Sequence, residues 1–145
     1  MGTLKSILLV EDDPADEMLI LRVMEKSHIA NRVDVVRDGQ EALDYLMCAG
    51  PYADRDPEDL PQTVLLDLKL PKLNGHEVLT AIRSDERLKS LPVVIMTSSS
   101  EESDIARSYD LGANSYVRKP VDFDQFSEAV RQLGLYWLVL NQPAP

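Results

Sequence analysis

The stretch TVLLDLKLPKLNG at residues 63–75 decides the fold of this chain. It begins with four mostly apolar residues, reaches Asp67, and then breaks at a proline and a glycine. A short apolar run bounded by such residues is typical of a strand buried between two layers of helices. Asp67 would then stand at the carboxyl end of a buried strand, where open parallel sheets bind their ligands.

Four further apolar runs alternate with segments of helical periodicity. We predict strands at residues 6–10, 32–36, 63–66, 93–96 and 115–118, and helices at residues 15–26, 40–47, 75–83, 101–111 and 122–133. Such alternation predicts the α/β class, with a doubly wound five-stranded parallel sheet and helices on both faces. With 145 residues the chain has the size of one domain. We therefore expect one domain over residues 1–145, with its core at about residues 5–133 and an apolar extension at 134–145.

The charge and the apolar pattern of the chain disfavour several kinds of partner. Fifteen Lys and Arg against 25 Asp and Glu give a net charge of −10, which disfavours nucleic acid because that affinity depends on cationic side chains. The apolar runs are too short for a signal peptide or a membrane span, so we expect a cytoplasmic protein without membrane contact. The apolar residues 135–140 must be covered by the domain itself or by a partner, and internal packing and a homodimer contact remain equally open.

Polar residues follow four of the predicted strands. Glu11 and Asp12 follow the first, Asp67 the third, Thr97 the fourth and Lys119 the fifth. Because the carboxyl ends of parallel strands share one edge of the sheet, these side chains should meet in space. Neighbouring carboxylates repel each other unless a cation lies between them, and oxygen ligands without His or Cys suit Mg²⁺. The sequence therefore predicts a magnesium site.

A magnesium site made of carboxylates indicates phosphoryl chemistry. Asp67 is the best candidate for a phosphoryl acceptor that forms an acyl phosphate, with the metal and Lys119 offsetting the charge of the transferred group. Thr97 would donate a hydrogen bond to that group. Each residue alone also has an ordinary interpretation as a helix cap, a strand residue or a surface charge, and we assign Asp13, before Pro14, to a cap. The prediction depends on their shared position.

Four motifs in this order, ILLVEDDP, VLLDLKLPKLNG, PVVIMTSSS and GANSYVRKPV, resemble the receiver domain of two-component response regulators. The resemblance covers about residues 5–133. It implies that Asp67 accepts a phosphoryl group from a histidine kinase and that Mg²⁺ is the cofactor. The implied metal ligands are Glu11, Asp12, Asp67 and the backbone carbonyl of Lys69. Glu11 departs from the general pattern of the family, in which Asp is more common at this place.

The same resemblance assigns the residues that would respond to phosphorylation. Thr97 matches the switch hydroxyl, Tyr116 the switch aromatic, and Lys119 the lysine that pairs with the phosphoryl group. The peptide bond between Lys119 and Pro120 would be cis. If Thr97 turns toward a new phosphoryl group, it vacates space that the ring of Tyr116 can fill, so one modification would select between two packings of the core. The alternative for Tyr116 is an ordinary strand aromatic.

A narrower resemblance concerns the long loop at residues 48–62, the run DLKLPKLNGHEVL and the Trp-containing end. Together they are most similar to the single-domain regulators that are partnered by phytochromes and often dimerise. This resemblance implies a light-sensing histidine kinase as the partner. Because few residues follow residue 133, we expect a signalling protein, not an enzyme, that acts through a contact with another protein.

Two other functions fit parts of the pattern. One is a receiver-like docking module that is never phosphorylated, which the complete set of site residues disfavours. The other is a Mg²⁺-dependent phosphohydrolase of the haloacid dehalogenase type, which also forms an aspartyl phosphate. Such enzymes need a second Asp two residues after the nucleophile, and Lys69 stands at that place.

Overall fold

The computed structural model of the chain describes residues 5–27, 29–98, 102–120, 122, 124–126 and 128. Within these residues one parallel sheet has the strand order β2-β1-β3-β4-β5. Its strands are β1 (Ile7–Val10), β2 (Val33–Val36), β3 (Thr63–Leu66), β4 (Val93–Thr97) and β5 (Ser115–Arg118). The helices are α1 (Pro14–Lys26), α2 (Gly39–Met47), α3 (Gly75–Ser84) and α4 (Glu102–Asp110), with a short 3₁₀ helix η1 (Gly50–Tyr52) after α2. The strand order changes direction between β1 and β3, as in a doubly wound sheet.

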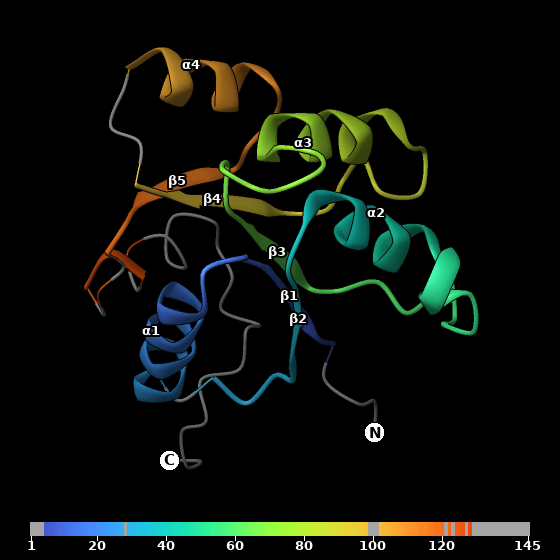
Figure 1. Ribbon diagram of the computed structural model, residues 1–145, viewed down its shortest axis with the longest axis horizontal. Helices are drawn as coiled ribbons and strands as arrows, with labels where there is room; N and C mark the ends of the chain where they lie inside the picture. Colours follow the sequence, from blue (N-terminus) through green and yellow to red (C-terminus); the bar gives the residue numbers. More distant parts are fainter. Residues whose placement is uncertain are drawn as a thin grey trace, which may run out of the picture.

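Helices cover both faces of the sheet (Figure 1), with α1 on one face and α2, α3 and α4 on the other. The side chains of β1 alternate between the two layers that result. Ile7 and Leu9 belong to the apolar cluster under α1, whereas Leu8 and Val10 belong to the cluster under α2 and α3, and all four are at most 1% exposed. Burial on both faces explains why β1 is a continuous apolar run rather than an alternating one.

The predicted fold class and all five predicted strands are confirmed, and no strand end differs by more than one residue. The first four helices agree to the same degree. Of the fifth predicted helix, residues 124–126 and 128 are helical, and Asp122 accepts a hydrogen bond from the backbone N–H of Gln125 at 2.8 Å, as an N-cap does. The remainder of that helix and the extension at 134–145 lie outside the described residues. Among the described helices, none has both the length and the apolar composition that a bilayer span requires.

Two helix starts are fixed by caps next to the carboxyl edge of the sheet. Asp13 accepts a hydrogen bond from the backbone N–H of Ala15 at 2.8 Å, and Pro14 opens α1, which confirms the predicted cap. Asn74 and Glu77 form a reciprocal capping box at the start of α3. Both helices therefore begin at the edge where β1 and β3 end.

Arg55 and Tyr52, both in the loop at residues 48–62, make the contacts that hold this loop in place. The guanidinium of Arg55 lies 3.7 Å from the ring centre of Tyr45 and donates a hydrogen bond to the backbone carbonyl of Asp59 at 2.7 Å. The hydroxyl of Tyr52 in η1 donates to the carboxylate of Glu41 at 2.7 Å. Because Tyr45 and Glu41 both belong to α2, this loop is attached to that helix.

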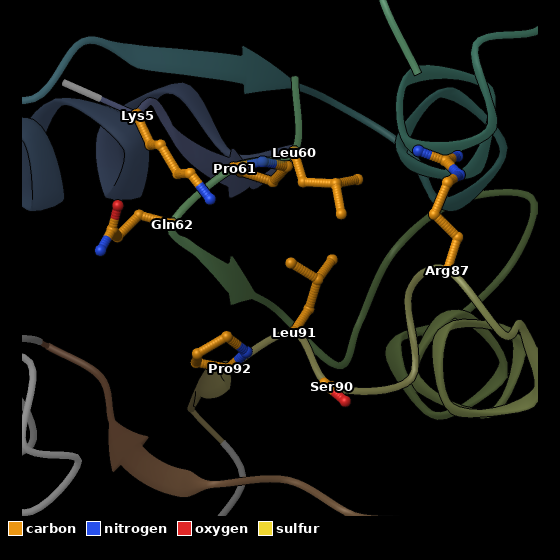
Figure 2. Close-up of a pocket in the computed structure, with 8 residues that line it drawn as sticks. All are labelled: Lys5, Leu60, Pro61, Gln62, Arg87, Ser90, Leu91 and Pro92. Atoms are coloured by element: carbon orange, nitrogen blue, oxygen red, sulfur yellow. The ribbon is translucent and has the colours of Figure 1, made fainter. Parts of the chain in front are cut away.

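A cavity of about 340 Å³ lies at the amino ends of β1, β3 and β4. Figure 2 shows the side chains of Leu60 and Leu91 facing each other across it. Its lining residues are Lys5, Leu60, Pro61, Gln62, Arg87, Ser90, Leu91 and Pro92. This cavity is at the opposite edge of the sheet from Asp67 and is separate from the site described next.

Candidate functional site

The polar residues that were predicted to meet lie at the carboxyl edge of the sheet. Backbone hydrogen bonds continue the sheet beyond the strand ends. The N–H of Asp67 donates to the carbonyl of Val10 at 3.1 Å, and the N–H of Lys119 donates to the carbonyl of Thr97 at 2.8 Å. Because the residues after the strands stay in register with the neighbouring strands, their side chains lie together at the carboxyl edge of the sheet.

Three carboxylates form an acidic group, Glu11, Asp12 and Asp67, in which one oxygen of each lies within 4.8 Å of the others. Glu11 and Asp67 are 1% and 5% exposed, whereas Asp12 is exposed. Burial raises the pKa of Glu11 to about 7, opposed by a hydrogen bond from Lys119 and helped by the charge of Asp67. An added cation would therefore lower the electrostatic repulsion among these carboxylates.

Lys119 is a cation that contacts this acidic group. Its ammonium nitrogen lies 2.5 Å from Glu11 Oε1, 2.9 Å from Asp16 Oδ2 and 3.1 Å from Asp67 Oδ2, and its side chain is 7% exposed. Burial alone would lower the pKa of this ammonium, but hydrogen bonds to Glu11 and Asp16 and the charge of Asp67 raise it instead. The Lys119 side chain is therefore charged. The peptide bond between Lys119 and Pro120 is cis, as the resemblance implied.

The acidic group fits a divalent cation. Its donors are carboxylate oxygens, which hard cations prefer, and Lys119 offsets only one of the negative charges. The backbone N–H of Lys69 donates to Asp67 Oδ1 at 3.3 Å, so this segment of the chain lies against the acidic group. The assignment of the Lys69 carbonyl as a metal ligand stays a prediction.

The predicted switch residues are neighbours on one face of the sheet. Thr97 ends β4 and is fully buried, and Tyr116 on β5 is half-buried against the cluster under α2 and α3. Tyr116 pairs with Ile95, which precedes Thr97 by two residues, so Tyr116 and Thr97 point to the same face. The structure brings this pair together, and the switching itself stays a prediction.

A close approach between α3 and the segment after β3 depends on Gly75. A Cβ at this position would lie 2.4 Å from the carbonyl oxygen of Asp67 and 2.7 Å from the Cα of Leu68. The N–H of Gly75 donates to the carbonyl of Leu68 at 2.8 Å. Sequence reasoning treated this glycine only as a break in the chain, whereas it lets α3 begin directly against the backbone that carries Asp67.

Sequence reasoning also missed Asp16. This residue stands in the first turn of α1, where an acidic side chain is ordinarily explained by the helix dipole. Its partner Lys119 is 103 residues away in the sequence. No local signal pointed to the pair, because only the folded arrangement brings the start of α1 next to the end of β5.

A doubly wound sheet with buried carboxylates, a threonine and a charged lysine at its carboxyl edge defines a class of protein, the flavodoxin-like receiver domain. Residues 7–131 match the family of response regulator receiver domains. The chain belongs to this family, whose role is to accept a phosphoryl group from a histidine kinase. Receiver domains are typically signalling modules rather than enzymes.

Three relatives show how closely the chain follows the family. The solved structure of the bacteriophytochrome response regulator RtBRR is 55% identical, with a TM-score of 0.88, and the match covers 99% of this chain and 86% of that chain. The structure of the phosphorylated cyanobacterial phytochrome response regulator RcpA is 41% identical, with a TM-score of 0.79 over 98% of this chain and 100% of that one. The probable methanogenesis regulatory protein FilR2 of Methanothrix harundinacea (strain 6Ac) is 44% identical over 140 residues, which are 96% of this chain and 88% of that protein.

Proposed function

We propose that this protein is a single-domain response regulator whose Asp67 accepts a phosphoryl group from a histidine kinase in a Mg²⁺-dependent reaction. The observation that carries the proposal is the position of Asp67. The residue is 5% exposed, and its carboxylate is grouped with Glu11 and Asp12 and paired with Lys119 at 3.1 Å. The proposal treats residues 1–145 as one receiver domain with its core at about 5–133.

In the proposed transfer, an oxygen of the Asp67 carboxylate forms a bond to phosphorus while the phosphorus–nitrogen bond of the kinase phosphohistidine breaks. The electron pair of that bond stays on the imidazole nitrogen, and the product is an acyl phosphate. Lys119, at 3.1 Å from Asp67 Oδ2, offsets negative charge on the transferred group. The backbone N–H of Lys69 holds the other carboxylate oxygen at 3.3 Å.

Mg²⁺ is the proposed cofactor because the acidic group is made of oxygen donors alone. The proposed ligands are Glu11, Asp12, Asp67 and the backbone carbonyl of Lys69. When bound, the ion supplies positive charge beside the phosphoryl oxygens. Because Glu11 has one more methylene than the Asp that is common in the family, we expect its carboxylate to reach the metal through a water or from a shifted position.

The proposed readout of phosphorylation runs through Thr97 and Tyr116. A phosphoryl group on Asp67 carries about two negative charges, and a hydroxyl turned toward it donates a hydrogen bond. Since Thr97 and Tyr116 share one face of β4 and β5, movement of the Thr97 side chain opens room for the Tyr116 ring. The output is then a changed protein-interaction surface rather than a turnover reaction.

We further propose a phytochrome-type, light-sensing histidine kinase as the partner. The support is that RtBRR and RcpA, at 55% and 41% identity, are phytochrome response regulators. FilR2 is named for methanogenesis at 44% identity, so the higher identity of RtBRR favours the phytochrome partner. The measurement is phosphoryl transfer from a phytochrome kinase in its two light states. Transfer no faster than from an unrelated histidine kinase would refute this partner. With this partner we also propose a cytoplasmic location for the protein.

We also propose that the extension at 134–145 contributes a homodimer contact. The support is the run of six apolar residues at 135–140, because monomers rarely expose a large apolar patch. Truncation after Leu133 should then weaken self-association in sedimentation velocity. An unchanged profile at matched concentration would assign the extension to packing against its own domain.

The test of the phosphoacceptor is an intact-mass spectrum after incubation with Mg²⁺ and a small phosphodonor. We expect a gain of one phosphoryl group that hydroxylamine removes, since hydroxylamine cleaves acyl phosphates. Asp67→Asn should abolish the gain. The matched control is Asp54→Asn, which makes the same change in an exposed residue of the loop at 48–62 and should keep the gain.

Two results would contradict the proposal. A normal stoichiometry of label in Asp67→Asn would show that another residue is the acceptor. The absence of any gain, with Mg²⁺ binding confirmed by calorimetry, would favour the docking-module function, in which the same fold is never phosphorylated.

A further inference from the structure

The ammonium group of Lys119 is shared among three carboxylates. It has three N–H donors, and Glu11, Asp16 and Asp67 each place an oxygen within 3.1 Å of the nitrogen. The side chain is 7% exposed. Because each donor has a carboxylate partner, a change at any one of the three acids redistributes the hydrogen bonds of Lys119 among the other two.

Asp16 differs from the other two partners. Glu11 and Asp67 belong to the acidic group that the structure assembles within 4.8 Å among the described residues, and Asp16 does not. A divalent cation in that group would draw on the carboxylate of Glu11, whose Oε1 now lies 2.5 Å from the Lys119 nitrogen. The ammonium and the metal therefore compete for Glu11, while Asp16 remains available to the ammonium throughout.

We propose that Asp16 is a positioning residue that keeps Lys119 over Asp67 and frees Glu11 for the metal. This inference rests on the proposed function of Asp67 as the phosphoryl acceptor. When the ammonium gives up Glu11, its bond to Asp16 at 2.9 Å keeps the nitrogen near Asp67 Oδ2. Without Asp16, Lys119 would return to Glu11 more strongly and would oppose the metal.

The backbone of Asp16 is well placed for this role. The cap residue Asp13 accepts a hydrogen bond from the N–H of Ala15 at 2.8 Å, and the N–H of Glu17 donates to the carbonyl of Asp13 at 2.9 Å, so the first turn of α1 is fixed. Deeper in the same helix, Ile20 is 2% exposed. The side chain of Asp16 is 32% exposed, so water screens its pairing with Lys119 and the expected effects are moderate.

The test is Asp16→Asn, which removes the charge and keeps the shape. We expect Mg²⁺ affinity, measured by calorimetry, to fall by about three- to tenfold. At saturating Mg²⁺, the rate of phosphorylation by a small phosphodonor should fall by a similar factor, because Lys119 is less well held. Asp16→Glu should recover most of both losses, because it restores the carboxylate.

The matched control is Glu17→Gln, the next residue of the same helix turn. It removes the same charge from an ion pair with Arg37 at 3.1 Å and should change Mg²⁺ affinity by less than about twofold. The second control is a Lys119→Gln background, in which Asp16→Asn should change Mg²⁺ affinity no more than Glu17→Gln does.

Three results would overturn the inference. Equal losses of Mg²⁺ affinity in Asp16→Asn and Glu17→Gln would mean that the effect comes from removing one negative charge and not from the contact with Lys119. An undiminished effect of Asp16→Asn in the Lys119→Gln background would show that it does not act through Lys119. Wild-type affinity and rate in Asp16→Asn would remove the role altogether. If the wild-type protein takes no phosphoryl group, the proposed function fails, and the Mg²⁺ measurements still decide whether Asp16 frees Glu11.

Discussion

Replacing Gly75 by alanine sets two physical effects against each other at the site. Helix propensity alone predicts that Gly75→Ala stabilises the protein by at most about 1 kcal/mol, the difference between the two residues inside a helix, because Gly75 belongs to α3. The structure predicts the opposite. A Cβ would lie 2.4 Å from the carbonyl oxygen of Asp67, about 1 Å closer than ordinary contact.

The atoms that would have to move belong to the backbone. The Cα of Leu68 would lie 2.7 Å from the new Cβ, and the carbonyl carbon of Asp67 would lie 3.1 Å from it. Rotating a side chain therefore cannot remove the overlap. Overpacking of this kind costs about 1–3 kcal/mol, and the displaced hydrogen bond from the Gly75 N–H to Leu68 adds about 1 kcal/mol. After the gain in propensity, we expect a net loss of roughly 1–3 kcal/mol.

The assay is urea unfolding, with Mg²⁺ calorimetry beside it. Because Gly75→Ala pushes on the backbone of Asp67, Mg²⁺ affinity should fall together with the free energy of unfolding. Ser84→Ala at the other end of α3 is the control and should change stability by no more than about 0.5 kcal/mol. A Gly75→Ala protein that is as stable as the wild type and binds Mg²⁺ equally well would refute the reasoning.

Three further changes test other parts of the structure. Lys119→Met should destabilise the metal-free protein by roughly 3 kcal/mol in urea, because it leaves buried carboxylates without their cation, and Mg²⁺ should recover part of that loss. Arg83→Lys should cost roughly 2 kcal/mol, because the guanidinium holds the carbonyl of Gly112 with two N–H groups at 2.9 and 2.7 Å and an ammonium cannot reproduce this fork. Burial, with the nearby positive charge of an arginine, lowers the pKa of His76, whose Nε2 lies 2.9 Å from Ser108 Oγ. As the pH falls, the unfolded chain therefore binds this proton before the folded protein does. The contribution of His76 to the free energy of unfolding is fully present above the ordinary pKa of 6.5 and is lost as the pH drops below it. His76→Gln should flatten this part of the dependence of stability on pH.

Each of these changes has an outcome that would contradict it. If Mg²⁺ recovers none of the stability that Lys119→Met loses, the loss does not come from unpaired charges in the acidic group. Wild-type stability in Arg83→Lys would show that the fork to Gly112 contributes little. An equal loss of stability between about pH 7.5 and about pH 5.5 in His76→Gln and in the wild type would assign the pH dependence to other groups.

The fold was predictable because its strands are buried on both faces. Leu8 and Leu9 point to opposite layers and are at most 1% exposed, so β1 had to be apolar throughout. Since parallel strands end at one edge, the same reasoning brought Asp67 and Lys119 together from 52 residues apart. The site followed from the fold, without any knowledge of side-chain contacts.

Side-chain pairs between elements could not be predicted in this way. Asp16 reads as an ordinary acid of a helix start, and its contact with Lys119 depends on where α1 lies against the sheet. His76, in the first turn of α3, gives no sequence signal for its contact with Ser108 on α4, where its ring is half-buried. Both contacts depend on the rotation and position of a helix, which periodicity alone does not determine.

The charges at the site argue that a divalent cation and Lys119 have different tasks. Lys119 already contacts Glu11, Asp16 and Asp67, so a single ammonium is divided among three acids before any phosphoryl group arrives. Phosphorylation adds about one further negative charge to Asp67, which that ammonium cannot offset alone. Chelating Mg²⁺ should therefore abolish phosphorylation by a small phosphodonor although Asp67 and Lys119 are unchanged. Label that persists in excess chelator would mean that the ammonium suffices, and the acidic group of Glu11, Asp12 and Asp67 would then need another explanation than metal binding.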